Sequence, residues 1–239
     1  MTLQDQRVVL LGGTSGIGLA TAGLAAAHGA TVIVASSNHE SVKRALDTLP
    51  ATATGQAVDL TDPVAVKAFF DGLDAFDHLV YTAGESLTLL DIASMDLDQA
   101  RKAFELRYFG ALGAVSAAAS KIRPGGSVVL TTGAAGDRPN PGWSVAASIC
   151  GAVDSLVRAL AVELAPLRVN AVKPGVVRSP LWSNLSVEDQ QTLYDETSRL
   201  LPVGRVGEVT DIAEAYVYLM NQGYATGTIL TVDGGHVLV

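Results

Sequence analysis

The chain has 239 residues, a length that suits one large α/β domain. Hydrophobic residues make up 49% of it and charged residues 17%, which favours a sheet covered by helices on both faces and disfavours a half-solvated β-sandwich. The net charge of −8 disfavours binding to nucleic acid, so any anionic ligand must be held by local groups.

Cysteine usage and hydropathy indicate the compartment. Cys150 is the single cysteine and has no partner for an internal disulfide. The sequence has neither a secretory leader pattern nor an uninterrupted apolar run of about 18–20 residues. We therefore expect a cytoplasmic protein without a membrane or nucleic-acid partner.

Short β-branched runs alternate with longer helical patterns along the chain, and the spacers are long enough for right-handed crossovers. This alternation predicts a single-domain Rossmann fold of the α/β class over residues 1–239, with helices on both faces of a doubly wound parallel sheet of about seven strands. The predicted strands are Arg7–Leu11, Thr31–Ala35, Thr54–Val58, Asp77–Tyr81, Ser127–Thr131, Arg168–Val172 and Thr228–Val232.

Two segments stand out from this pattern. Ala146–Ala165 is an alanine-rich helical stretch with few charges, suited to packing on another subunit. Leu181–Leu201 is more polar and less periodic than its surroundings, which is typical of a lid over a pocket.

A glycine-rich turn, LGGTSGIG at Leu11–Gly18, lies between the first strand and the first helix. In this context Gly12 permits a sharp turn, Gly16 lets the backbone approach a pyrophosphate, and Gly18 permits close helix–strand packing. The positive end of the helix dipole favours the phosphates. We therefore expect a nicotinamide dinucleotide here, with contacts also from Thr14, Ser15 and Ile17.

The spacing Gly-x-x-x-Gly-x-Gly resembles that of the short-chain dehydrogenase/reductase family, as do Asp59-Leu60, Ala83-Gly84, NAVKPG at 170–175, GRVGEVTDIA and the final VDGG. The resemblance covers nearly the whole chain. It implies that Asp59 accepts a hydrogen bond from the adenine amino group and that Leu60 packs beside it. It further implies that Ala83 and Gly84 line the ribose, and that Pro174, Gly175, Val177 and Ser179 border the nicotinamide.

The end of the second strand bears on the form of the cofactor. An acidic side chain there would bind the ribose hydroxyls of NAD, but the chain has Ser36, Ser37 and Asn38. Their small polar groups favour NADP(H) over NAD(H), with His39, Lys43 and Arg44 as the nearby sources of positive charge. The same three residues suit the cap of a helix beginning around Glu40.

At the catalytic positions implied by the resemblance, this chain has residues of other types. The family usually has Asn, Ser and a Tyr-x-x-x-Lys pair, and these positions fall on Arg107, Gly133, Ala146 and Cys150. Alanine has no titratable proton and cysteine is no lasting cation, so the usual proton relay is absent. Tyr81-Thr82-Ala83-Gly84 also departs from the usual Asn-Asn-Ala-Gly.

Arg107 is the main candidate to replace these groups, because its guanidinium can polarise a carbonyl or hold the nicotinamide ribose, although it cannot donate the proton. The structural alternative for Arg107 is an ion pair with Glu105 or another acid. Cys150 fits a packed helix residue better than a nucleophile. Weaker candidates are Thr132, Ser144 and Tyr108 as donors and Trp143 as a pocket wall, and no metal site is expected.

Three functions are compatible with these residues. The first is an NADP(H)-dependent oxidoreductase with an atypical site, acting on a carbonyl or alcohol of a small molecule. The second is an inactive dinucleotide-binding protein or partner subunit, and the third is an isomerase, dehydratase or cyclase that performs no redox step. The resemblance also implies a homodimer or homotetramer.

Overall fold

The β-branched runs form strands in the computed structural model, which describes residues 2–87 and 89–239. Most side chains of these strands are buried on both faces, as expected for a parallel sheet between helices. The seven predicted strands are all confirmed within the described residues. They are β1 (Arg7–Leu11), β2 (Thr31–Ser36), β3 (Thr54–Ala57), β4 (Phe76–Tyr81), β5 (Ile122–Thr131), β6 (Arg168–Pro174) and β9 (Ile229–Val232).

The strands pair in parallel in the order β3-β2-β1-β4-β5-β6-β9. The order reverses between β1 and β4, where Leu11 lies opposite Tyr81. Ligands of open α/β sheets bind at such a switch point, outside the carboxyl ends of the strands. The fold class predicted from the sequence, a single-domain Rossmann fold, is thus confirmed.

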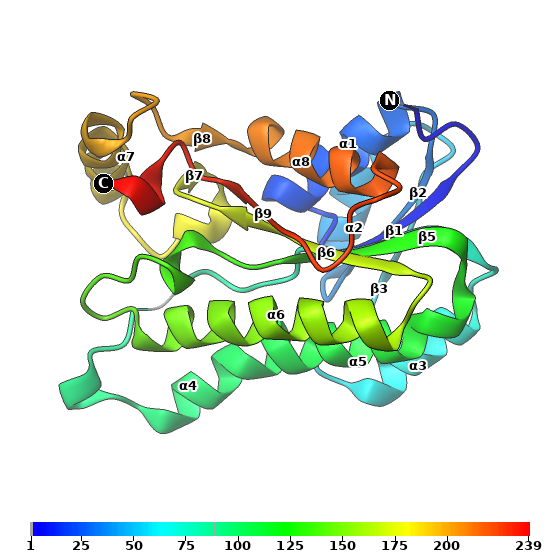
Figure 1. The fold of residues 1–239 in the computed structure, drawn as a ribbon, viewed down its shortest axis with the longest axis horizontal. Helices are drawn as coiled ribbons and strands as arrows, with labels where there is room; N and C mark the ends of the chain where they lie inside the picture. Colours follow the sequence, from blue (N-terminus) through cyan, green and yellow to red (C-terminus); the bar gives the residue numbers. More distant parts are fainter. Residues whose placement is uncertain (1, 88) are drawn as a thin grey trace.

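The helices lie on both faces of the sheet (Figure 1). In the figure, α1 and α8 lie side by side above it, and α3, α5 and α6 lie below it. A short parallel pair, β7 (Val177–Arg178) and β8 (Gly207–Glu208), lies next to α7. The helices are α1 (Gly16–Ala27), α2 (His39–Leu46), α3 (Pro63–Asp71), α4 (Leu97–Phe104), α5 (Ala111–Ala118), α6 (Ser144–Glu163), α7 (Val187–Leu200) and α8 (Val209–Asn221).

Local capping sets several helix starts. The Asn38 side chain accepts a hydrogen bond from the Ser41 backbone at 3.0 Å, so α2 begins at His39. Asp62 caps α3 in the same way, and Pro63 occupies the first helical turn, where its missing N–H costs nothing. The start of α2 thus lies one residue before Glu40, around which the sequence predicted it.

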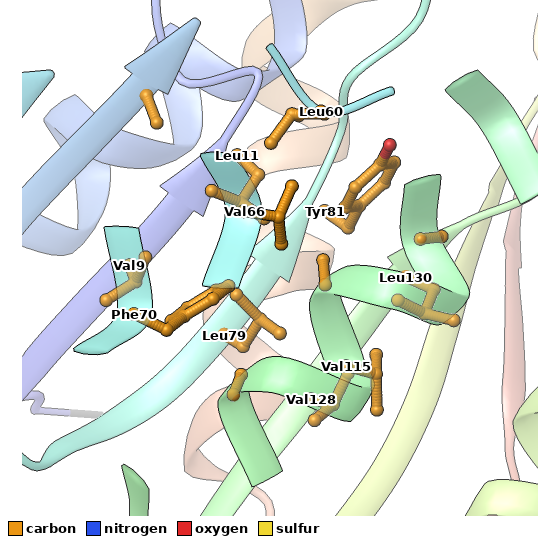
Figure 2. Packing of buried hydrophobic residues seen from close by; sticks show 14 of the residues in the cluster. Val9, Leu11, Leu60, Val66, Phe70, Leu79, Tyr81, Val115, Val128 and Leu130 are labelled. Atoms are coloured by element: carbon orange, nitrogen blue, oxygen red, sulfur yellow. The ribbon is translucent and has the colours of Figure 1, made fainter. Parts of the chain in front are cut away.

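The core consists of an apolar layer on each side of the sheet. The lower layer joins inward-facing strand residues such as Val9, Leu79 and Val128 to Phe70 of α3 and Val115 of α5 (Figure 2). These two layers hold the strands rigidly, so that the loops at their carboxyl ends have a fixed base.

The helix α6 corresponds to the alanine-rich stretch predicted at Ala146–Ala165. By length and composition it is the one helix in the described residues that is apolar enough to cross a membrane. Its buried residues, among them Val153, Val157 and Leu160, belong to the layer below the sheet. Val162 faces outward with 81% of its surface exposed.

Candidate active site

A cleft of about 1020 Å³ opens at the carboxyl ends of the strands. It begins at the glycine-rich turn after β1 and continues past the ends of β4, β5 and β6 to the short helix η5 (Pro180–Trp182). One part is lined by backbone and small polar side chains, and another by apolar groups that include Leu87, Trp143 and Trp182. The cleft therefore has room for a dinucleotide and a second, less polar molecule.

The glycine-rich turn meets the geometry predicted for it. Gly12 has a φ of +87°, and a Cβ there would lie 2.5 Å from the Ala83 nitrogen of the neighbouring strand end. At Gly18 a Cβ would lie 2.2 Å from the Gly12 carbonyl oxygen. Glycine at position 12 thus lets the turn approach the end of β4, and glycine at position 18 lets the first helix approach the turn.

The N-terminus of α1 suits an anion. Ser15 precedes the helix in extended backbone and its side chain makes no capping hydrogen bond, and no acidic residue stands in the first turn. The first backbone N–H groups of the helix thus keep their attraction for phosphate oxygens. These residues fit the pyrophosphate of a dinucleotide.

The cleft brings together almost all of the residues predicted to contact the cofactor. Asn38 is the exception: its side chain caps α2 and does not line the cleft. Those that do line it are Gly12, Thr14, Ser15, Gly16, Ile17, Gly18, Ser36, Ser37, Asp59, Leu60, Ala83, Gly84, Pro174, Gly175, Val177 and Ser179.

Asp59 lies at the adenine end predicted for the cleft. Its Oδ1 atom accepts hydrogen bonds from the Thr61 hydroxyl at 2.7 Å and the Thr61 backbone N–H at 2.9 Å. These bonds lower the pKa of the Asp59 carboxyl below its usual value of 3.8, and the bond from the Thr61 hydroxyl has the larger effect. Asp59 is therefore a hydrogen-bond acceptor at neutral pH.

The three positions predicted to replace Ser, Tyr and Lys also line the cleft. They form a wall of small groups, because a Cβ on Gly133 would lie 3.2 Å from Cys150 Sγ and Ala146 stands one helical turn earlier on α6. Burial raises the pKa of the Cys150 thiol above its usual value of 9.0. At neutral pH this thiol is neutral, which agrees with a packed helix residue rather than a nucleophile.

Arg107 lines the cleft and also makes an ion pair. Its Nε lies 3.7 Å from Glu85 Oε2, and its Nη2 donates a hydrogen bond to the Glu85 carbonyl oxygen. The partner is Glu85, not the neighbouring Glu105 named from the sequence. The Arg107 side chain is 26% exposed.

The weaker candidates separate into two groups. Thr132 and Trp143 line the cleft, whereas Tyr108 and Ser144 are outside its lining. The Tyr108 ring packs edge-on against Phe109, with the ring centroids 5.2 Å apart. The hydroxyl of Tyr108 is therefore a poor candidate for proton donation in the cleft.

Sequence patterns missed one wall of the cleft, formed by the loop after β4 and the segment around η5. The Leu87 N–H donates to the Leu181 carbonyl at 3.0 Å, and the hydroxyls of Ser86 and Ser183 lie 2.6 Å apart. These contacts close one side of the cleft with the start of the segment predicted as a lid. Neither stretch has helical or strand periodicity, so no pattern in the sequence indicated that the two lie together.

A buried ion cluster lies near the cleft, at the end of β6. Lys173 of β6 donates from Nζ to Asp137 Oδ2 at 2.6 Å and to Asp154 Oδ2 at 2.7 Å. Burial lowers the pKa of the Lys173 amine, but the two carboxylates outweigh it and raise the pKa above its usual 10.5. The cluster connects β6 to α6 and to the loop after β5.

The fold, switch point and glycine turn are those of a dinucleotide-binding protein. Residues 12–236 match the family described as enoyl-(acyl carrier protein) reductase. The chain is 34% identical to the short-chain dehydrogenase/reductase ATR9 of Stachybotrys chlorohalonatus, over 99% of both proteins. It belongs to the short-chain dehydrogenase/reductase family, whose members are oxidoreductases that bind nicotinamide dinucleotides.

Two further comparisons bear on the site. The short-chain dehydrogenase/reductase malC of Malbranchea aurantiaca is 32% identical over 99% of this chain and 96% of its own. Its structure, described as that of a reductase/Diels-Alderase, superposes with a TM-score of 0.92 at 31% identity, covering 99% of this chain and 98% of that one. A small-chain dehydrogenase in complex with NADPH superposes with a TM-score of 0.87 at 34% identity, covering 99% and 100%.

Proposed function

We propose that the protein is an NADP(H)-dependent reductase of a carbonyl group on an apolar small molecule, with Arg107 in place of the family's usual proton relay. The observation that carries this proposal is the position of Arg107. Its guanidinium lines the cleft beside Gly84, on the cofactor side, while Trp143 and Leu181 provide apolar lining elsewhere in the cleft. A substrate in the apolar part can direct its carbonyl oxygen at this cation.

When bound, NADPH supplies the hydride to the carbonyl carbon. Arg107 attracts the negative charge that grows on the carbonyl oxygen and remains protonated itself. Ala146 offers no proton at the position predicted for Tyr, and Cys150 offers no cation at the position predicted for Lys, so in this proposal the alkoxide takes its proton from water. Preorganised charge and proximity each contribute several kcal/mol, which sustains turnover without a relay.

The preference for NADP(H) rests on the end of β2. Ser36 and Ser37 line the cleft there, without a carboxylate to repel a 2′-phosphate. The related dehydrogenase in complex with NADPH supports the same choice. We expect Ser36→Asp to weaken NADPH binding and to strengthen NADH binding, measured as dissociation constants by calorimetry.

The proposal is tested by mixing the purified protein with NADPH and a panel of aromatic diketones, activated ketones and aldehydes. We expect consumption of NADPH, followed at the nicotinamide absorbance, with one molecule of alcohol formed per NADPH oxidised. Tight NADPH binding without turnover on the whole panel would instead support an inactive dinucleotide-binding protein or partner subunit.

A second candidate, a cyclase or isomerase without a redox step, is favoured by the similarity to the reductase/Diels-Alderase. Gly133, Ala146 and Cys150 are small groups in the cleft lining at the positions predicted for Ser, Tyr and Lys, which agrees with an activity that needs no proton relay. Formation of an isomeric product while the nicotinamide absorbance stays constant would identify this activity.

We also infer a homodimer or homotetramer. Leu97 and Phe109, on and just after α4, are 60% and 51% exposed, and both line a shallow apolar hollow. Light scattering coupled to size exclusion gives the mass of the assembly, and a monomer at micromolar concentration would contradict the inference.

A further inference from the structure

Tyr81, the last residue of β4, connects the sheet to the helix that carries Arg107. Its side chain is 2% exposed, and its hydroxyl donates a hydrogen bond to the Leu106 carbonyl at 2.6 Å. Figure 2 shows the ring at the edge of the apolar cluster, with the hydroxyl oxygen directed away from Val66 and Leu79. The bond spans 25 positions of sequence and fixes the residue directly before Arg107.

The helix is irregular at this point. Between α4 and α5 the backbone takes one π-helical turn, η2 (Glu105–Gly110). A π turn shifts the carbonyl partners by one residue relative to an α-helix, and such turns are found frequently at functional sites. The Tyr81 hydroxyl gives the Leu106 carbonyl a donor from outside the helix, which stabilises the irregular turn.

The space around the phenol is fitted to it. A Cβ at Gly110, the last residue of η2, would lie 2.5 Å from the Tyr81 hydroxyl oxygen. Gly110 is buried, so the phenol has little room to move aside. Tyr81, Leu106 and Gly110 thus form one interlocked contact in the wall of the cleft, which Tyr81 and Leu106 line.

The arginine also contacts the loop that follows β4. A Cβ at Gly84 would lie 2.7 Å from Arg107 Nη1 and 2.8 Å from Arg107 Cζ. The guanidinium is therefore packed over this loop, and Glu85 of the same loop binds it. Tyr81 thus holds the backbone directly before Arg107, and Gly84, three positions after Tyr81 in sequence, contacts the guanidinium.

We propose that Tyr81 is a positioning residue, which holds the π turn so that the Arg107 guanidinium stays over Gly84 in the cleft. This inference rests on the proposed role of Arg107. Tyr81 is not itself a proton donor, because its hydroxyl proton is engaged by the Leu106 carbonyl. Burial also raises the pKa of the phenol well above its usual value of 10.0.

The test is a double-mutant cycle on Tyr81→Phe and Arg107→Ala, read in single-turnover oxidation of NADPH with the best ketone of the panel. We expect Tyr81→Phe to lower the rate constant roughly 10-fold, the effect of about one hydrogen bond. Its dissociation constant for NADPH should not change. In the Arg107→Ala background, Tyr81→Phe should lower the rate constant less than about 2-fold, because the guanidinium that Tyr81 positions is absent.

The outcomes separate the two proposals. If Arg107→Ala has no effect on the rate, the role of Arg107 fails, and the positioning role of Tyr81 fails with it. If Arg107→Ala slows the reaction while Tyr81→Phe has no effect, or costs the same in both backgrounds, the role of Arg107 stands and that of Tyr81 is overturned.

Tyr108→Phe is the matched control, since Tyr108 lies on the same π turn but outside the cleft lining, and it should keep the parent rate.

A thermal unfolding curve for each variant shows whether it folds. If Tyr81→Phe does not fold, Gly110→Ala replaces it, because its new Cβ displaces the phenol. Gly110→Ala should show the same loss of rate, and a parent rate in it would overturn the proposal.

Discussion

The guanidinium of Arg107 occupies the space in which a side chain on Gly84 would stand, since a Cβ there would lie 2.7 Å from Nη1. Arg107 comes from the turn after α4, and Gly84 comes from the loop after β4. The contact therefore joins the predicted ribose-binding loop to the main candidate for electrostatic catalysis. A cation in this position can act on both the cofactor and the substrate.

Arg107→Ala should lower kcat roughly 100-fold, the usual cost of removing one preorganised donor from a developing oxyanion. NADPH affinity should fall much less, because the glycine turn holds the pyrophosphate. Steady-state kinetics with the ketone substrate and calorimetry with NADPH separate the two effects. Arg101→Ala is the control: Arg101 is on the preceding helix α4, where it is exposed and pairs with Asp98. An equal loss in both variants would contradict the role of Arg107.

Gly18→Ala should abolish dinucleotide binding, because the new Cβ would lie 2.2 Å from the Gly12 carbonyl oxygen and would force the turn apart. A Cβ on Gly23 of the same helix would meet none of the other described elements within 4 Å, so Gly23→Ala should bind NADPH normally. It should also be more stable by about 0.5–1 kcal/mol, the helix preference for alanine over glycine. Calorimetric binding and denaturant unfolding measure both variants, and tight NADPH binding by Gly18→Ala would refute the prediction.

Cys150 should react slowly with iodoacetamide at neutral pH, because burial raises the pKa of its thiol and keeps the thiolate scarce. The rate should increase with pH through and above the usual value of 9.0, and mass spectrometry of the intact protein measures it. Cys150→Ala should retain reductase activity. Fast alkylation at pH 7, or complete loss of activity in Cys150→Ala, would restore the thiol as a nucleophile.

These sites differ in how far the sequence predicts them. The glycine turn was predictable because one of its constraints, the contact of Gly18 with the Gly12 carbonyl, acts within one turn and one helix start. The surroundings of Arg107 were not, since its ion-pair partner Glu85 and the phenol of Tyr81 lie 22 and 26 positions away in sequence. Only the pairing of β1 with β4 brings that loop to the cleft.

The strands were also predictable, because a parallel sheet buried on both faces requires continuous β-branched runs. Asn38 shows the opposite case. A small polar residue at a strand end suits a phosphate and a helix cap equally well, and its hydrogen bond to Ser41 shows the cap. Of the wall formed by the Ser86 and Ser183 segments, the sequence indicated the second, within the predicted lid Leu181–Leu201, but not its contact with the loop after β4.

Lys173→Met should destabilise the fold by about 3–5 kcal/mol, since it leaves the carboxylate of Asp154 buried without a counter-charge. The lysine side chain is 5% exposed and that of Asp154 11%, and Asp154 Oδ1 already has no hydrogen-bond partner within the described residues. Denaturant unfolding measures the loss. Lys67→Met is the control, because Lys67 pairs with Asp71 on the surface and should change stability by less than about 1 kcal/mol.

The same cluster predicts a pH dependence. The carboxylates of Asp137 and Asp154 raise the pKa of Lys173 above 10.5 in the folded protein, despite the opposing effect of burial. A lysine whose pKa is higher in the folded protein than in the unfolded chain stabilises the fold fully at pH values below its unfolded pKa. This contribution to stability is lost as the pH rises through its folded pKa. The unfolding free energy of the parent should therefore fall at strongly alkaline pH, and Lys173→Met should lack this component.

Asp154→Leu added to Lys173→Met removes the unpaired buried charge and should recover part of the stability, because an apolar pair suits this site better than a lone carboxylate. A double variant less stable than Lys173→Met would show that the carboxylate is held by other contacts.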